Sequence, residues 1–398
     1  MQTGWLKDRN IIQWGGEVLY FMLILVIMLD PTNSVLHLKD VFFILLVGYN
    51  CAFYKPDLSY LPHIFGIYSI IMLSYIFGQM QGCVVDEEML MGTIKGFAPL
   101  FLLLWSPYYD VIRLSKIPVL IVTTVIAILY VAVSSSEVIE LFVWQFVKAH
   151  NEMIIMTHRS FLGVEIFGMY YKSIISFIFV LFIFYYKLYN EHRRKLLYLV
   201  VCAVMTFSFL ISGTRSSMLL PFLMIALVMY RTFMKWPKMR YFFYPLLALF
   251  GVCIVGFILI LATEKGETSN AMKYAHLTSY AMLFEENPLY LIFGQGPGAV
   301  FYSAGFGRWT SQTEWTYIEL VRNYGILCVG ILIVMFIPVY KLFKHRRHEI
   351  AFGMLGSYIV YLFVAGTNPL FVSSTGMIVL LSVYSFVYRI ENKLEIKY

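Results

Sequence analysis

Four arginines and one glutamate have the residue types and positions best suited to chemistry: Arg159, Arg215, Arg308, Arg322 and Glu314. A guanidinium group forks onto phosphate or carboxylate oxygens. A charged group at the centre of a membrane span costs roughly 2.5–3.5 kcal/mol and is a functional candidate by default. Arg322 lies inside an apolar run and Arg215 begins another. These arginines predict an outward-facing site for a phosphate or diphosphate. The alternative is internal pairing, for instance of Arg322 with Glu319 or Glu314.

Glu314 stands about two helical turns before Arg322, where a long hydrophilic stretch returns to an apolar run. A partly desolvated carboxylate at this point could take a proton from a sugar hydroxyl. The other interpretation is a carboxylate that complements the dipole at the N-terminus of a helix.

The same hydrophilic stretch contains the candidate substrate-binding residues Lys273, His276, Arg308, Gln312 and Tyr317, to which Arg159 is added. Each has a simpler alternative: a lone histidine is often structural, an exposed arginine is solvated, and aromatic residues form interfacial belts. Residues 294–298 (GQGPG) lack the following Lys-Ser/Thr of a P-loop, so they predict a tight turn with close backbone approach.

The composition explains how such residues come to lie in apolar surroundings. The 398 residues are 60% hydrophobic and 13% charged, against about 45–50% and 25% in soluble domains. This excludes a water-soluble globule, a disordered chain and a secreted disulfide scaffold, and indicates a polytopic membrane protein. No C-x-x-C motif or Cys/His cluster indicates a metal site. The net charge of +7 reflects the positive-inside rule rather than nucleic-acid binding.

Apolar runs between charged breaks predict an all-α protein with about twelve transmembrane helices: 11–29, 36–54, 61–78, 92–107, 117–134, 166–186, 196–211, 215–233, 241–262, 316–340, 350–365 and 371–388. Most Lys and Arg residues fall in alternate connections, which predicts a cytoplasmic location for those connections and for both termini. Residues 1–398 then form a single membrane domain. On the outer side lie the segment 135–165, whose pattern suits a helix in the membrane interface or a buried re-entrant segment, and a large periplasmic loop, 263–315.

Three stretches resemble the O-antigen polymerases (Wzy). They are residues 292–298 (IFGQGPG) with 312–325 (QTEWTYIELVRNYG), residues 211–217 (ISGTRSS), and residues 366–370 (GTNPL) with 373–376 (SSTG). The second and third also resemble motifs of the wider superfamily that includes the O-antigen ligases. Span number, orientation and the large outer loop are similar over the whole chain.

The resemblance implies a GT-C-type glycosyltransferase in the inner membrane of a Gram-negative bacterium, with its active site facing the periplasm. Its substrates would be glycan repeat units linked to undecaprenyl diphosphate, with membrane lipid around it and a chain-length regulator as a candidate partner. Arg215 and Arg322, with Arg159, would hold the departing diphosphate, and Glu314 would activate the acceptor hydroxyl. No metal or other cofactor is required by this scheme, because guanidinium groups supply the charge stabilisation.

Two rival functions remain open. An O-antigen ligase would transfer the glycan to lipid A-core, although Glu314 stands about where the related ligases carry a histidine. A polysaccharide transporter or flippase would also have many spans with both termini inside. Such carriers often contain internal repeats, and the two halves of this sequence do not visibly match.

Overall fold

The computed structural model describes residues 2–150, 153–161, 164–233, 266–366, 368 and 370–394, with the single positions 241, 245 and 252. For residues 2–10, 159–161, 164–166, 215, 231–233 and 266–270 the description covers the backbone alone. The predicted span 241–262 therefore lies outside the described residues, apart from isolated positions.

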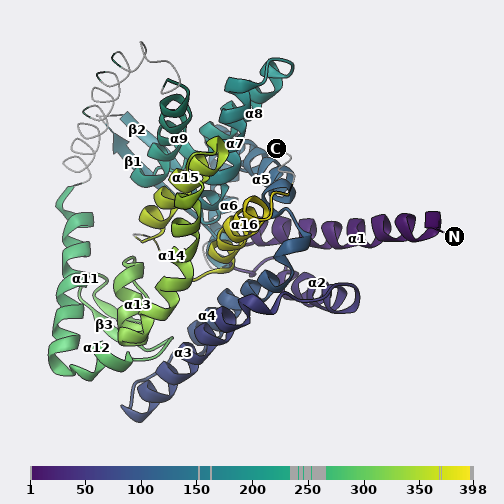
Figure 1. Ribbon diagram of the computed structural model, residues 1–398. Coiled ribbons are helices and arrows are strands. Elements are labelled where there is room, and N and C mark those ends of the chain that lie inside the picture. The colour runs from purple at the N-terminus through teal and green to yellow at the C-terminus, as the bar shows by residue number, and fades with distance from the viewer. Residues whose placement is uncertain are drawn as a thin grey trace.

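The chain is almost entirely helical (Figure 1). Its α-helices are α1 (Gln2–Leu29), α2 (Lys39–Phe53), α3 (Leu61–Met80), α4 (Glu87–Phe97), α5 (Val111–Ser135), α6 (Glu137–Ala149), α7 (Ile178–Asn190), α8 (Lys195–Leu210), α9 (Arg215–Phe233), α11 (Gly266–Glu286), α12 (Leu289–Phe293), α13 (Thr316–Tyr324), α14 (Cys328–Lys344), α15 (Glu349–Gly366) and α16 (Ser374–Glu391). Two antiparallel hairpins interrupt them, β1 (Ile154–Phe161) with β2 (Val164–Tyr171), and β3 (Phe301–Ser303) with β4 (Arg308–Thr310).

Six helical segments among the described residues are long and apolar enough to cross a membrane: Ile11–Leu29, Leu58–Met80, Glu87–Tyr108, Val111–Ser135, Thr316–Lys344 and Glu349–Gly366. They indicate a multi-pass membrane protein. The prediction of about twelve long spans is wrong, because several predicted spans are shorter helices, such as α2 with 15 residues and α8 with 16.

The predicted span 166–186 is also incorrect at its start. The structure divides this apolar run into β2, a 3₁₀ turn (Ile174–Phe177) and α7. The first part, Val164–Tyr171, is rich in β-branched and aromatic residues that favour strands. Hydrophobicity alone does not separate a buried strand from a buried helix segment.

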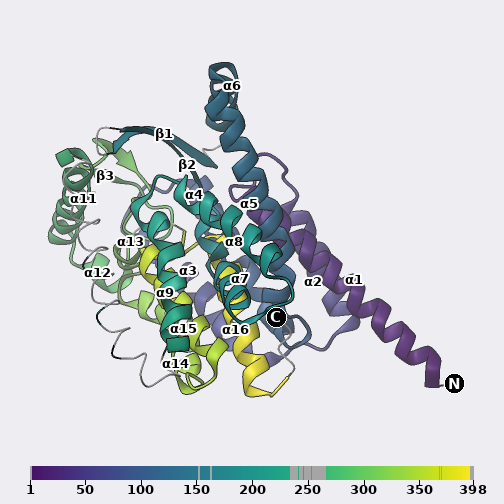
Figure 2. The same cartoon turned by 90° about the horizontal axis from the view of Figure 1, so that it is seen from above.

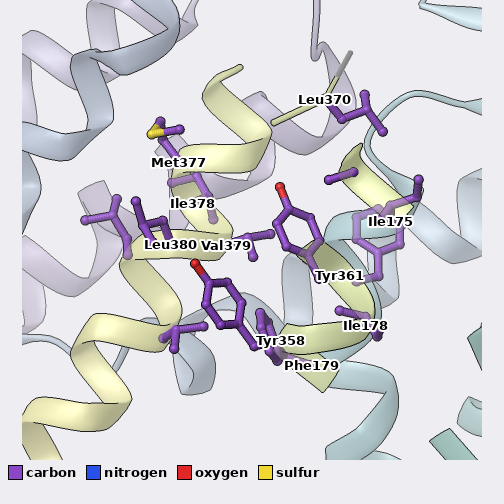
Figure 3. Packing of buried hydrophobic residues seen from close by; sticks show 14 of the residues in the cluster. Ile175, Ile178, Phe179, Tyr358, Tyr361, Leu370, Met377, Ile378, Val379 and Leu380 are labelled. Atoms are coloured by element: carbon purple, nitrogen blue, oxygen red, sulfur yellow. The ribbon is translucent and has the colours of Figure 1, made fainter. Parts of the chain in front are cut away.

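The core is centred on α16, in which every residue from Ser374 to Val387 is buried. This helix packs against the 3₁₀ segment Ala98–Tyr108 and against α5, α14 and α1. Beside it, Tyr358 and Tyr361 of α15 lie with Ile175 and Phe179 (Figure 3). A helix that is apolar on all sides is expected to be enclosed by its neighbours.

The connections between helices form two groups. Predicted outer connections contact one another: Asp86 Oδ2 accepts from Ser311 Oγ at 3.1 Å, and Ser34 Oγ donates to the His150 carbonyl at 2.8 Å. We call the end of the molecule where these outer connections meet the hairpin end. Predicted cytoplasmic connections also contact one another: Lys341 pairs with Glu391 at 3.0 Å, and Arg389 pairs with Asp110 at 3.5 Å. The grouping in space therefore follows the grouping by charge in the sequence.

In the predicted outer segment 135–165 the structure describes the helix α6, the strand β1 and the first two residues of β2. Helix α6 extends from the end of α5 and projects from the body of the molecule (Figure 2). Its exposed apolar residues include Val138, Leu141 and Phe142. The helix agrees with the sequence pattern, whereas the β1–β2 hairpin was not predicted. The described part of the predicted loop 263–315 contains α11, α12 and the β3–β4 hairpin.

Candidate functional site

The glycine-rich stretch 294–298 is a tight turn pressed against α13. Gly294, Gly296 and Gly298 all have positive φ, between 77° and 89°. A Cβ atom on Gly294 would lie 2.2 Å from the backbone oxygen of Asn323. The backbone N–H of residue 295 donates to the Arg322 carbonyl at 2.7 Å. The prediction of close backbone approach is confirmed, since only glycine fits this conformation and this space.

Arg322 is fully buried, with 0% of its side chain exposed. Its five N–H groups all donate to protein acceptors at 2.7–3.0 Å. These acceptors are Glu319 Oε2 (twice), Gln295 Oε1 and the carbonyl oxygens of Ala299 and Ser311. The guanidinium also lies over the Phe301 ring, 4.5 Å from its centroid. Arg322 therefore connects α13 to the glycine turn and to the segment that follows β4.

Glu319 is equally occupied. Its Oε2 faces Arg322, and its Oε1 accepts from the Thr313 backbone N–H at 2.9 Å and from the Tyr280 hydroxyl at 2.5 Å. The internal pairing weighed as an alternative for Arg322 is thus present. In this arrangement the guanidinium has no N–H left for a phosphate, which makes Arg322 a positioning residue for the surrounding loops.

Glu314 is held much more loosely. It precedes α13, and its side chain is 47% exposed. Among the described residues it forms an ion pair with Lys273, whose Nζ lies 3.8 Å from Oε2. Burial and the nearby Glu314 charge raise the pKa of Tyr170 on β2, and the Tyr170 hydroxyl has no hydrogen-bond partner among the described residues. Because its side chain is about half exposed, Glu314 presents its carboxylate oxygens at the surface of the hairpin end.

His276 lies behind the β3–β4 hairpin and is 0% exposed. Its Nδ1 is 2.7 Å from Ser303 Oγ, and its ring meets Phe306 edge-on. Burial lowers the pKa of His276, with a smaller contribution from Lys273, while Glu314 and Glu319 act in the opposite direction. This packing resembles the structural alternative considered for a lone histidine more than a substrate contact.

The other predicted contacts are dispersed. Arg308 is exposed on β4, near the Phe306 ring. Tyr317 donates from its hydroxyl to the Leu362 carbonyl at 2.8 Å. Gln312 lines the cavity described below.

Arg159 and Arg215 are described by their backbone alone. Arg159 pairs with Ile166 in the β1–β2 hairpin, and Arg215 begins α9. The turn before Arg215 contacts β2, where the Met169 N–H donates to the Ile211 carbonyl at 2.8 Å. The start of α9 thus adjoins the strand that carries Tyr170. The side chains of both arginines are outside the described part of the chain.

A cavity of about 210 Å³ lies beside Glu319, at the hairpin end. Distant segments of the chain meet there, and its lining comprises Pro31, Thr32, Met89, Gly92, Thr93, Lys172, Gly298, Ser311, Gln312, Thr313, Thr316, Glu319, Leu320, Asn323, Tyr324, Leu370, Val372, Ser373 and Thr375. Sequence reasoning missed Thr93 and Lys172 as site residues. Lys172 carried a signal, because it is a basic residue on the side that the positive-inside rule predicts to be poor in them.

Within the described residues, no group of three or more His, Cys, Asp or Glu side chains is placed to hold a metal ion. No protein-family model, curated protein or solved structure matches the chain.

Proposed function

We propose that the protein is a glycosyltransferase similar to the O-antigen polymerases, which joins glycan repeat units carried on undecaprenyl diphosphate. One observation carries this proposal. The stretches 292–298, 312–325 and 366–376 are separated in sequence and carry the resemblance, and each contributes to the lining of the same cavity. Convergence of this kind is expected of a functional site and is not required by helix packing alone.

The reaction requires a base, a leaving group and a positioned acceptor. An acceptor hydroxyl oxygen attacks the anomeric carbon of the donor glycan, the bond from that carbon to the phosphate oxygen breaks, and undecaprenyl diphosphate departs. Glu314 takes the proton from the attacking hydroxyl, as its exposed oxygens allow. Arg215, with Arg159, holds the diphosphate and stabilises its charge as it leaves.

Arg322 has a different role in this proposal. Because its donors are saturated by the protein, it fixes the glycine turn and the segment 311–313 rather than contacting the diphosphate. We propose an orientation with both termini in the cytoplasm and the hairpin end in the periplasm, in the inner membrane. A chain-length regulator is a candidate partner, and no metal is needed.

A surface-glycan gel tests the function. Cells lacking the gene are complemented with the wild type, with Glu314→Gln or with the matched variant Glu286→Gln, whose residue is also exposed. We expect deletion to leave single repeats on lipid A-core, and wild type and Glu286→Gln to restore the ladder. Loss of all glycan from the core in the deletion strain would favour a ligase or a transport step. A ladder that is unchanged in the deletion strain would rule out the proposal.

A further inference from the structure

The polar groups that line the cavity have an unusual balance of donors and acceptors. Many are hydroxyl groups, and a hydroxyl has one proton to donate and two lone pairs to accept with. Several of these protons are already used. Thr93 donates to the Met89 carbonyl at 2.9 Å, and Thr316 donates to the Asn368 carbonyl at 2.5 Å. Their oxygens remain able to accept.

Two more hydroxyl groups of the lining follow the same rule. Ser311 donates to Asp86 Oδ2 at 3.1 Å, and Ser373 donates to the Leu370 carbonyl at 2.5 Å. These four hydroxyl groups therefore present oxygen lone pairs, and no free proton, to whatever occupies the cavity. A diphosphate is an acceptor without donors at neutral pH, so this surface does not suit it.

Two buried polar atoms that belong to residues of the lining have no hydrogen-bond partner among the described residues. They are the amide oxygen of Asn323 and the hydroxyl of Tyr324, a residue only 1% exposed. A buried polar atom without a hydrogen bond is unfavourable, which makes it a strong attractor for a matching ligand group.

The charges in the lining agree with this balance. Among the described lining residues, Lys172 and Glu319 are the ionisable groups other than Tyr324. The Glu319 carboxylate is neutralised by Arg322, which lies behind it and has no free donor. One lysine is little for a diphosphate, which is normally held by several cationic or backbone N–H donors.

We infer that this cavity recognises an uncharged, hydroxyl-rich sugar unit of the acceptor glycan, rather than the diphosphate of the donor. This inference rests on the proposed function and specifies the ligand of that site. Leu320, Leu370 and Val372 supply apolar contact for the C–H faces of the sugar. Gln312 and Thr313 line the cavity and directly precede Glu314, which places the acceptor next to the base.

Binding to the purified protein in lipid nanodiscs tests the inference. The probe is the single repeat-unit oligosaccharide of the host's surface glycan, released from its lipid by mild acid, and calorimetry measures its affinity. Thr93→Val removes a lining oxygen with little change in shape. We expect about three- to tenfold weaker binding, the usual effect of one lost hydrogen bond. Thr375→Val is a second variant of the same kind.

The matched control is Thr124→Val. Thr124 makes the same type of back-bond, to the Leu120 carbonyl at 2.8 Å, but lies exposed on α5. We expect unchanged affinity for this variant. We also expect inorganic pyrophosphate not to displace the oligosaccharide. Displacement by pyrophosphate, no binding by the wild type, or wild-type affinity in both Thr93→Val and Thr375→Val would overturn the inference.

The outcome is separable from that of the proposed function. If deletion of the gene abolishes the glycan ladder but the lining variants bind normally, the inference about the cavity fails alone. If the ladder survives deletion while the oligosaccharide binds and the lining variants weaken it, the sugar site stands and the polymerase function fails.

Discussion

Two acid–base pairs at the hairpin end differ in almost every physical respect. Arg322 and Glu319 are buried, 2.7 Å apart, and bonded to several other groups. Lys273 and Glu314 are 35% and 47% exposed, and 3.8 Å apart. A saturated buried pair is suited to fixing the positions of other segments, whereas a loosely held carboxylate is free to exchange a proton. Each pair joins one basic and one acidic side chain, so the number of hydrogen bonds and the burial of the side chains separate the two roles.

Breaking the buried pair tests the first half of this comparison. We expect Arg322→Met to destabilise the protein by about 3–5 kcal/mol, because Glu319 is left as an uncompensated buried charge. Lys95→Met is the control, since Lys95 pairs with Asp40 at 3.0 Å but is exposed, and such pairs contribute about 0–1 kcal/mol. Chemical unfolding in detergent measures both, and equal stability of the two variants would refute the structural role of Arg322.

The glycine turn that Arg322 holds gives a smaller effect. We expect Gly294→Ala to destabilise by more than about 1 kcal/mol, because φ is +77° and the added Cβ would meet the Asn323 carbonyl. Gly66→Ala is the control, as its Cβ would meet nothing within 4 Å and it lies in α3. The same unfolding assay compares them. A Gly294→Ala protein as stable as Gly66→Ala would show that the turn does not need its close contact with α13.

The smallest predicted effect concerns pH. Because burial lowers the pKa of His276 below 6.5, the unfolded chain binds a proton more readily than the folded protein. The free energy of unfolding should therefore be at its full value above about pH 6.5 and decrease as the pH falls from 6.5 to the lowered pKa, by at most about 1.4 kcal/mol per pH unit. His276→Phe should remove this contribution to the pH dependence of stability. An identical pH dependence in wild type and variant would contradict the prediction.

Much of the helical architecture could be predicted from the sequence, because long apolar runs leave few alternatives in a membrane. The alternation of basic connections likewise predicts which segments meet. The hairpin of residues 154–171 could not be predicted, since apolarity alone does not distinguish a strand from a helix at this length.

The candidate site was harder to predict than the fold. Sequence position identified Arg322, Glu319 and Glu314 as notable residues, but not which arginine donors are already occupied. That depends on carbonyl groups at Ala299 and Ser311, which reach Arg322 through the three-dimensional path of the chain. The contribution of Thr93 to the cavity depends in the same way on how α4 packs against α16.

The most direct test of the account is polymer formation by the purified protein from lipid-linked repeat units, with EDTA present. We expect the wild type and Glu286→Gln to form polymer at similar rates. We expect Glu314→Gln to be slower by about 10²–10⁴-fold, the usual contribution of a general base, with unchanged stability. Near-normal polymer from Glu314→Gln would contradict the role of Glu314. Loss of wild-type activity in EDTA that a divalent ion restores would contradict the metal-free scheme.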